Sequence, residues 1–192
     1  MPTPDDDAYG LRQLGADDID LVQRFFERNP EYFLAVNGEG PGPDEAKNEF
    51  ADLPPAGMPY RAMWLLGFFE DGGELIGVAT IVGDFIRPHV WHIGLFIVAS
   101  ALHGSGVAHF LYRRLERWMI DQGARWLRLG VVQGNVKAER FWLRCGYVQV
   151  RERGPLTMGK KTNVLRVMAK PLAGGTIAEY LALVERDRPG AP

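Results

Sequence analysis

The centre of the chain contains a run of apolar residues followed by a helical pattern. Residues 93–98 (Ile-Gly-Leu-Phe-Ile-Val) are apolar at nearly every position, which is typical of a strand buried on both faces. Further on, apolar residues recur at spacings of three and four, the period of one helix face: Val107, Leu111, Leu115 and Trp118. The pattern predicts a buried strand over residues 90–98 that leads through a short loop into a helix ending near Gln122.

Similar patterns predict further elements on both sides of this unit. Short apolar or alternating runs predict strands at residues 9–14, 62–70, 74–84, 126–132, 147–153 and 164–171. Helical spacing predicts helices at residues 17–28, 44–51, 135–146 and 176–186, the first capped by Asp17 or Asp18. Residues 71–73 are the expected turn of a hairpin, and residues 154–162 are expected to form a mobile loop. Residues 31–58 are less regular, apart from the short helix at 44–51.

Composition narrows the class of protein. A chain of 192 residues with 46% hydrophobic residues and a net charge of −2 is typical of one soluble globular domain. No apolar run approaches the length of about 18 residues that spans a membrane, so no membrane association is expected. The acidic first eight residues resemble neither a signal nor a transit peptide and are expected to be a disordered tail. Cys145 is the one cysteine, which favours a reducing, cytoplasmic location.

The loop between the central strand and its helix is a candidate anion site. It reads His103-Gly104-Ser105-Gly106-Val107-Ala108. A glycine loop that enters a helix leaves backbone N–H groups unpaired, and the helix dipole adds positive potential there, which suits phosphate. An ordinary tight turn is the alternative interpretation. The loop is neither a Walker sequence nor a complete dinucleotide-binding sequence.

A second stretch, Asn135 to Tyr147, makes the interpretation specific. It reads Asn-Val-Lys-Ala-Glu-Arg-Phe-Trp-Leu-Arg-Cys-Gly-Tyr. Together the two stretches resemble the GNAT superfamily of acyl-CoA-dependent N-acetyltransferases, which carry [R/Q]-x-x-G-x-[G/A] and, about thirty residues later, N-x-x-A-x-x-F-Y-x-x-x-G-[F/Y]. The resemblance implies an α/β fold with a mixed sheet of about seven strands and helices on both faces. It covers residues 9–172, which leaves residues 173–192 as a C-terminal extension with a short helix.

The resemblance also implies how a cosubstrate, acetyl-CoA, is bound. Backbone N–H groups of residues 103–108 would bind the pyrophosphate. Two parallel strands of the fold splay apart, and the pantetheine arm would bond to the backbone of Phe96, Ile97 and Val98, where an N–H would also polarise the thioester carbonyl. Asn135 would cap its helix, contributing roughly 1 kcal/mol, and contact the arm. The alternative is that the strand residues are only core residues. No metal site is expected.

His92 is the candidate general base. Many members of the family have a glutamate at this position, and an imidazole titrates near neutrality. Strand alternation places His92 on the face opposite Trp91 and Ile93, with Gly94 next to it leaving room for a substrate. The alternative is a structural histidine bonded to a backbone carbonyl. His89, Glu70 and Asp84 are weaker candidates.

Two positions depart from the family pattern. Trp142 stands where the family often has a tyrosine that acts as general acid, and an indole N–H donates a hydrogen bond but transfers no proton usefully. Water, Tyr112 or Tyr147 are the alternatives, and Cys145 is expected to be a buried core residue. His103 replaces the usual Arg or Gln, which leaves only backbone contacts to phosphate.

These observations lead to two hypotheses. The first is an N-acetyltransferase that transfers an acetyl group directly from acetyl-CoA to a primary amine of a small molecule, with a protein N-terminus or lysine as alternative acceptor. The second is an acyl-CoA-binding regulatory or sensor module with little catalysis. Residues 1–60 hold thirteen acidic and four basic residues, and residues 101–170 hold fourteen basic and four acidic, which suits a cationic amine and a phosphate ligand respectively. The arginines form no dense run, so no nucleic acid partner is expected. A homodimer is expected only by analogy with the fold.

Overall fold

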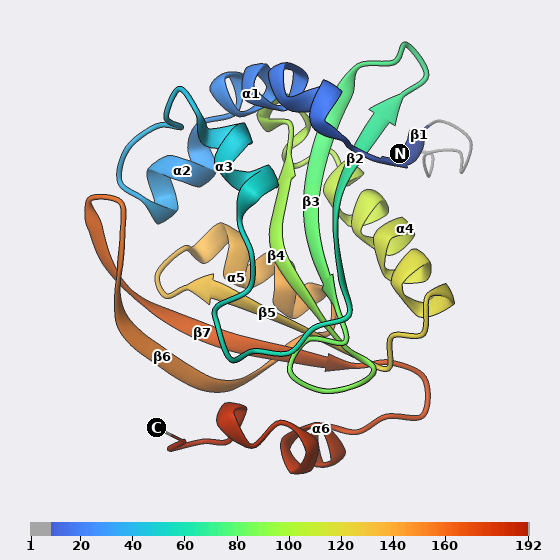
Figure 1. Cartoon of the computed structure of the whole chain (residues 1–192), viewed down its shortest axis with the longest axis vertical. Coiled ribbons are helices and arrows are strands. Elements are labelled where there is room, and N and C mark those ends of the chain that lie inside the picture. The colour runs from blue at the N-terminus through green and yellow to red at the C-terminus, as the bar shows by residue number, and fades with distance from the viewer. Residues whose placement is uncertain (1–8, 192) are drawn as a thin grey trace.

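A computed structural model describes residues 9–191, and within them seven strands form one sheet (Figure 1). The strands are β1 (Tyr9–Gln13), β2 (Ala62–Glu70), β3 (Leu75–Gly83), β4 (Val90–Val98), β5 (Trp126–Val132), β6 (Val148–Met158) and β7 (Lys161–Pro171). Their order is β1-β2-β3-β4-β5-β7-β6. β4 and β5 are parallel and the other neighbours are antiparallel, so the expected mixed sheet of about seven strands is confirmed.

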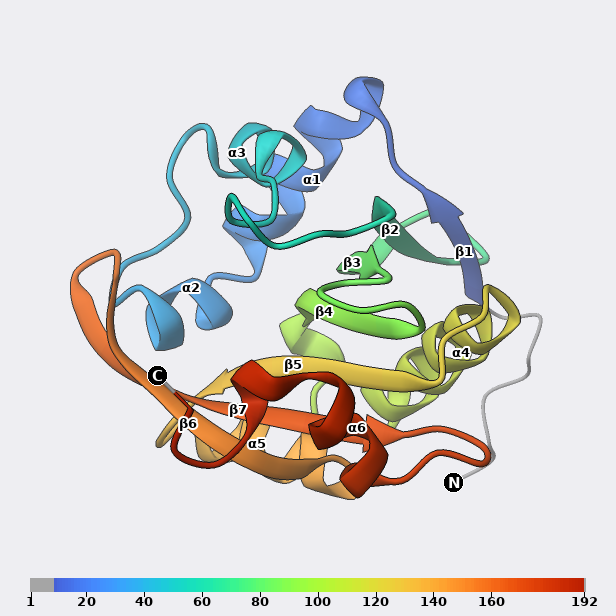
Figure 2. The ribbon, with the colours of Figure 1, turned by 60° about the horizontal axis from the view of Figure 1, so that its bottom comes forward.

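Helices cover both faces of this sheet. On one face, α4 (Val107–Asp121) and α5 (Val136–Arg144) pack on a core that includes Trp91 and Ile93 of β4. The other face carries α1 (Ile19–Arg28), α2 (Glu31–Val36) and α3 (Glu45–Ala51) over one half of the sheet. The C-terminal helix α6 (Ile177–Leu183) covers the other half of that face (Figure 2). Helices α1–α3 and α6 therefore lie on the same side, with the middle of the sheet between them.

The parallel pair at the centre of the sheet separates after four residues. β4 pairs with β5 only from Val90 opposite Trp126 to Ile93 opposite Leu129. The separation begins at a bulge in β4, because Thr80 and Ile81 of β3 face Leu95 and Ile93 and leave Gly94 without a partner. A bulge bends a strand away from its neighbour. The backbone of β4 beyond Gly94 therefore has no strand beside it on the β5 side.

Most elements lie where the apolar pattern predicts them. β4 and β5 have the predicted bounds, and the predicted hairpin is formed by β2 and β3. The structure also contains α2, within a region whose pattern indicated no helix; Phe33 and Val36 are buried there, but six residues are too few to show a helical period. The expected helix cap is wrong in detail, because Asp18 bonds to Arg12 and to the Gly15 N–H instead of capping α1.

The prediction of a mobile loop at residues 154–162 is wrong. β6 and β7 extend through it and form a long hairpin. Its tip is attached to α2: Lys161 donates to the carbonyls of Leu34 and Ala35, at 3.0 and 3.1 Å, and Asn163 donates to that of Val36 at 2.8 Å. The Gly, Pro and Lys residues of this segment disfavour regular structure locally. The tertiary contacts with α2 outweigh that preference.

The C-terminal segment packs against the sheet. Thr176 caps α6 in a capping box with Glu179, and Tyr180 and Val184 are fully buried. A short 3₁₀ helix, η4 (Glu185–Asp187), follows. The predicted tail, residues 1–8, lies outside the described residues. None of the helices in residues 9–191 is long and apolar enough to cross a membrane.

Candidate active site

The loop before α4 exposes backbone donors to open space. Gly104 and Gly106 have φ angles of +81° and +93°, a conformation that glycine adopts without strain. A Cβ at either position would meet no atom within 4 Å. The N–H groups of Gly104, Gly106 and Ala108 find no acceptor in the described part of the chain. The loop and the first turn of α4 therefore offer the unpaired donors that an anionic group requires.

The side chains of His103 and Ser105 form hydrogen bonds within the protein. His103 Nε2 lies 3.0 Å from the Val98 carbonyl oxygen, to which it donates a hydrogen bond. Ser105 Oγ donates to the Leu102 carbonyl at 2.6 Å and accepts from the Val107 N–H at 3.3 Å. These bonds hold the loop against the end of β4. Contacts to a ligand at residues 103–108 would come from the backbone, as expected from the replacement of Arg or Gln by His103.

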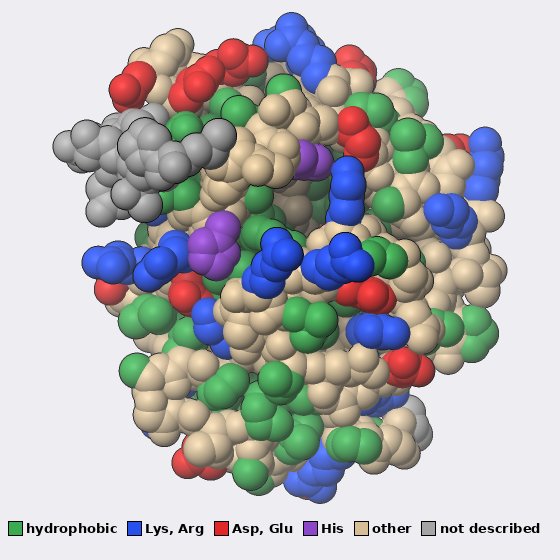
Figure 3. Space-filling model, turned by 180° about the vertical axis from the view of Figure 1, so that it is seen from behind, with side chains coloured by type: hydrophobic (Ala, Val, Ile, Leu, Met, Phe, Trp, Pro, Cys, Tyr) green, Lys and Arg blue, Asp and Glu red, His purple; other side chains and the backbone are tan. Residues whose placement is uncertain are grey.

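The surface around this loop is basic. Figure 3, which views the molecule from behind, shows a hollow bordered by His, Lys and Arg side chains. Three cations of α5 are exposed: Lys137, Arg140 and Arg144. Their positive potential would favour a ligand that carries several phosphates.

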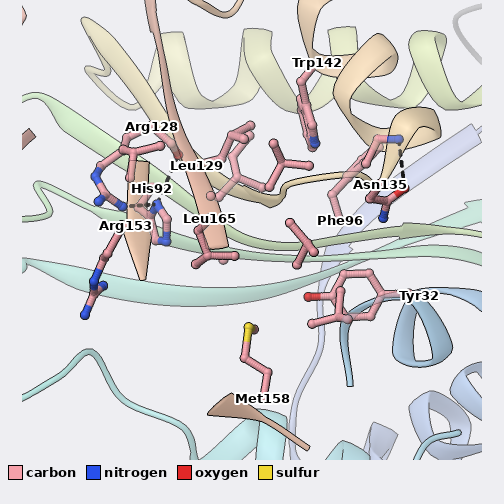
Figure 4. A pocket seen from close by; sticks show the side chains of 18 residues that line it. Tyr32, His92, Phe96, Arg128, Leu129, Asn135, Trp142, Arg153, Met158 and Leu165 are labelled. Carbon is pink, nitrogen blue, oxygen red and sulfur yellow. Dashed lines mark hydrogen bonds between the residues drawn. The ribbon is translucent and has the colours of Figure 1, made fainter. Parts of the chain in front are cut away.

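A pocket of about 220 Å³ lies where β4 and β5 separate (Figure 4). It is lined by β4, β5, α2, α5 and the β6–β7 hairpin, and the residues on its wall include Tyr32, His92, Gly94, Phe96, Arg128, Asn135, Trp142, Arg153 and Met158. Asn135, Trp142 and Phe96 lie at one end, and His92, Arg128 and Arg153 at the other (Figure 4). The structure thus brings together residues from five separate segments.

The end formed by α5 contains the predicted Asn135 and Trp142. Asn135 Oδ1 accepts from the Ala138 N–H at 3.2 Å, which confirms its part as helix cap. The indole nitrogen of Trp142 points towards the pocket (Figure 4). The Phe96 ring stacks on Phe141, with centroids 5.8 Å apart. The side chains of Ile97 and Val98 are buried in the core, so only the β4 backbone is free for a ligand.

His92 is enclosed at the opposite end. Its ring stacks on Phe85 at 5.0 Å, and its Nδ1 lies 3.1 Å from the Arg128 carbonyl oxygen and 3.3 Å from Arg128 Nη1. Burial, together with the charge of Arg128, lowers the pKa of His92 to about 3. The imidazole is therefore neutral at physiological pH. The predicted general base is present in the pocket, and it also makes the backbone contact of the structural alternative.

Arg128 is part of a buried ion pair that the sequence pattern did not predict. Its Nε and Nη2 donate to the two carboxylate oxygens of Asp187 at 2.7 and 3.1 Å, and Tyr180 donates to the same carboxylate at 2.5 Å. Burial alone would raise the pKa of Asp187, but the bonds and charge of Arg128 keep it below its ordinary value. One signal was available: an arginine inside the apolar run Trp126–Val132 requires a buried partner.

A second polar contact, between Glu49 and Thr80, lies near the α2 and α3 side of the pocket. Glu49 of α3 accepts a hydrogen bond from Thr80 Oγ1, next to the bulge at Gly94. Burial raises the pKa of Glu49 above its ordinary value. Burial also raises the pKa of Tyr32, and the charges of Glu49 and Glu45 add to that effect. Nothing in the local pattern around residues 31–49 indicated these contacts, because they depend on where α2 and α3 pack.

The other candidate residues lie outside the pocket wall. Tyr112 donates to Glu116 at 2.7 Å and lies 3.2 Å from the Tyr147 hydroxyl, and both tyrosines are buried in the core. Cys145 is buried in the core, as predicted, and this burial raises the pKa of its thiol to about 12. His89, Glu70 and Asp84 lie near strand ends. Within residues 9–191, no group of three or more His, Cys, Asp or Glu side chains could hold a metal ion.

Comparison with known proteins gives one family match and several similar structures. The acetyltransferase (GNAT) family model matches residues 20–147. No curated protein matches the chain. An acetyltransferase from Thermus thermophilus is similar in structure, with a TM-score of 0.68 and 23% identity over 86% of this chain and 97% of that chain. A GCN5-related N-acetyltransferase from Kribbella flavida gives 0.63 and 22% over 86% and 99%.

A third similar structure contains ligands. It is the spermidine N-acetyltransferase from Vibrio cholerae in complex with CoA and spermine, with a TM-score of 0.64 and 18% identity over 86% of this chain and 96% of that chain. The splayed sheet and the family match together define an acyltransferase enzyme. The chain belongs to the acetyltransferase (GNAT) family. Enzymes of this family use acetyl-CoA.

Proposed function

We propose that this protein transfers an acetyl group from acetyl-CoA to a primary amine of a small molecule, by direct attack without a covalent enzyme intermediate. The observation that carries the proposal is the opening between β4 and β5 at the Gly94 bulge, with the glycine loop and its unpaired N–H groups at the end of the same strand. One unpaired strand edge and one anion site in sequence fit a cosubstrate with an extended amide arm and a pyrophosphate.

The cosubstrate is held mainly by backbone in this proposal. N–H groups of residues 103–108 bind the pyrophosphate, and the β4 backbone at Phe96, Ile97 and Val98 bonds to the pantetheine arm. An N–H of this strand polarises the thioester carbonyl, in the way that an oxyanion hole does. Asn135 lies across the opening from Phe96 and contacts the arm (Figure 4).

His92 is the proton acceptor in this proposal, and its buried surroundings limit its basicity. A pKa of about 3 makes the imidazole a weak base, although it is neutral and ready to accept. It therefore suits an amine that arrives uncharged and becomes acidic once it bonds to the carbonyl carbon. If the Nδ1–H donates to the Arg128 carbonyl, Nε2 is the atom that accepts.

The departing thiolate is stabilised by hydrogen bonding. The Trp142 indole N–H points into the pocket and is the donor that stands where the family often has a tyrosine (Figure 4). A thiol with an ordinary pKa near 8.5 leaves as a thiolate without full protonation. Tyr112 and Tyr147 are bonded to each other in the core and take no part.

The shape of the acceptor side favours a small molecule over a protein. The β6–β7 hairpin is attached to α2 by Lys161 and Asn163, so it forms a wall over the pocket. A protein N-terminus or a lysine would have to enter a partly open pocket of about 220 Å³ beneath this hairpin. One observation favours the second candidate function, a regulatory acyl-CoA-binding module: Trp142 and the weakly basic His92 are both poor proton-transfer groups.

Titration calorimetry with acetyl-CoA tests the proposal. We expect micromolar binding by the wild type, equivalent to about −8 kcal/mol, and none by Gly106→Trp, whose side chain fills the anion site. Gly190→Trp is the matched control, because Gly190 also has a positive φ, +77°, and open space around it, far from the loop. Equal binding by all three proteins would refute the site.

Turnover with a panel of amines then separates the two functions. Acetylated product, formed by the wild type and reduced at least tenfold in His92→Gln, supports the enzyme. Binding of acetyl-CoA without transfer to any amine identifies the regulatory module.

A further inference from the structure

Four arginines gather at the end of the pocket that contains His92. Arg128 of β5 and Arg153 of β6 line the pocket wall. Arg151 and Arg153 pair with Val167 and Leu165 of β7, which places both on the same face of the hairpin. Arg151 also donates to the main-chain carbonyl of Arg186, in the segment after α6. The Arg186 guanidinium lies close enough to the other three for their charges to act on it.

The acidic groups nearby do not balance these four charges. Both carboxylate oxygens of Asp187 are bonded to Arg128. Glu152 accepts from Gln133 and Gln149, and Glu185 pairs with Arg188. Arg186 Nη1 lies 3.0 Å from the Met58 sulfur instead of a carboxylate. The backbone of Arg153 pairs with Leu165 in the sheet, but its guanidinium makes no hydrogen bond or ion pair with any residue in the range 9–191.

The pKa of Arg186 also indicates an excess of positive charge in this cluster. Burial lowers the pKa of Arg186, and the neighbouring charges of Arg128, Arg153 and Arg151 lower it further. Asp187 opposes this effect on Arg186 but is already bonded to Arg128, so the cluster as a whole holds more positive than negative charge. An anionic ligand at this end of the pocket would supply negative charge, in a partly enclosed site where a charge-assisted hydrogen bond is strong.

We propose that the amine acceptor also carries an anionic group, which Arg153 binds at the His92 end of the pocket. This inference rests on the proposed acetyl transfer and names the class of its acceptor: an amino acid or an aminophosphonate, in which few bonds separate the amine from the acid. The amine lies near the Gly94 bulge, between Arg153 at one end and Trp142 at the other (Figure 4). A polyamine fits poorly, because its second cation would face the guanidiniums.

Matched pairs of acceptors test the proposal. Each pair is an amino acid and the amine left by its decarboxylation, and a third arm replaces the carboxylate by a phosphonate. For the wild type we expect kcat/KM to be at least tenfold higher for the anionic acceptor. Arg153→Met is expected to lower kcat/KM for the anionic acceptor by about 10- to 100-fold and to leave that for the plain amine unchanged. The phosphonate arm shows which anion the site prefers.

Arg24→Met is the matched control, because Arg24 is exposed on α1, away from the pocket. It should leave both members of each pair unchanged. If the wild type acetylates the decarboxylated amine with the same kcat/KM as the amino acid, the inference is overturned. The proposed acetyl transfer would still stand.

A binding measurement keeps the test independent of turnover. The N-acetylated amino acid retains the anion but has no cationic amine. Calorimetry in the presence of CoA should show that this product binds the wild type at least tenfold more tightly than Arg153→Met. Equal binding would overturn the inference, whereas absent binding of CoA itself would refute the proposed function.

Discussion

The two ends of the pocket are built in different ways. At the end where we propose that the cofactor binds, here the cofactor end, the loop 103–108, the edge of β4 and the start of α5 offer mostly backbone groups, each set by a few neighbouring residues. At the acceptor end, His92, Arg128 and Arg153 come from three strands, and Asp187 comes from the segment after α6. A backbone site depends on local conformation. A side-chain site depends on how distant segments pack.

Because of this difference, we expect the two ends of the pocket to respond differently to substitution. We expect the cofactor end to tolerate substitutions that leave the backbone shape unchanged, such as His103 in place of the Arg or Gln of the family pattern. At the acceptor end, each charged group depends on its partner. The following predictions test that contrast.

The largest expected effect is at the buried ion pair of the acceptor end. Asp187→Ala leaves the Arg128 charge buried without a partner, and the side chains of Arg128 and Asp187 are 7% and 1% exposed. We expect a loss of about 3–5 kcal/mol in the free energy of unfolding, measured in urea. The double variant Arg128→Met/Asp187→Leu should recover much of it, because no isolated charge remains. A loss below about 1 kcal/mol in Asp187→Ala would contradict the pairing.

The pH dependence of stability tests the burial of His92. Its pKa falls from 6.5 to about 3 on folding, so the unfolded chain binds a proton that the native protein does not as pH falls below 6.5. Stability is therefore lost on acidification, with a slope approaching about 1.4 kcal/mol per pH unit between these values. His92→Gln keeps a donor for the Arg128 carbonyl but does not titrate. The difference in slope between the two proteins from pH 6.5 to about 4.5 reports His92, and identical slopes would show that the ring is solvated.

The attachment of the hairpin to α2 should affect the acceptor more than the cosubstrate. Asn163→Ala removes the bond to the buried Val36 carbonyl and is expected to cost about 1–3 kcal/mol. KM for the amine should rise while the Kd of acetyl-CoA stays unchanged, because this bond holds the hairpin tip to α2, away from the loop 103–108 and the edge of β4. An increase in the Kd of acetyl-CoA alone would place the hairpin at the wrong end of the pocket.

The smallest effect is expected at the cap of α5. Asn135→Ala should cost about 1 kcal/mol of stability and also weaken acetyl-CoA binding. Thr176→Ala is the matched control, since Thr176 caps α6 and lies away from the cofactor end. It should cost a similar amount of stability and leave binding unchanged. If both variants bind acetyl-CoA like the wild type, Asn135 is only a cap.

The sequence by itself determined most of the elements and the local features of the proposed cofactor end. The apolar runs of β4 and β5 and the period of α4 have the length and regularity that local rules detect. The glycine loop and Asn135 could be located for the same reason: a positive φ and a helix cap are properties of a few adjacent residues. Only tertiary structure decided the acceptor end. The bulge at Gly94, the ordered hairpin at residues 154–162, the low pKa of His92 and the Arg128–Asp187 pair all arise from contacts between residues far apart in the chain. Such contacts change the energy of a group through burial and neighbouring charge, which no local pattern contains.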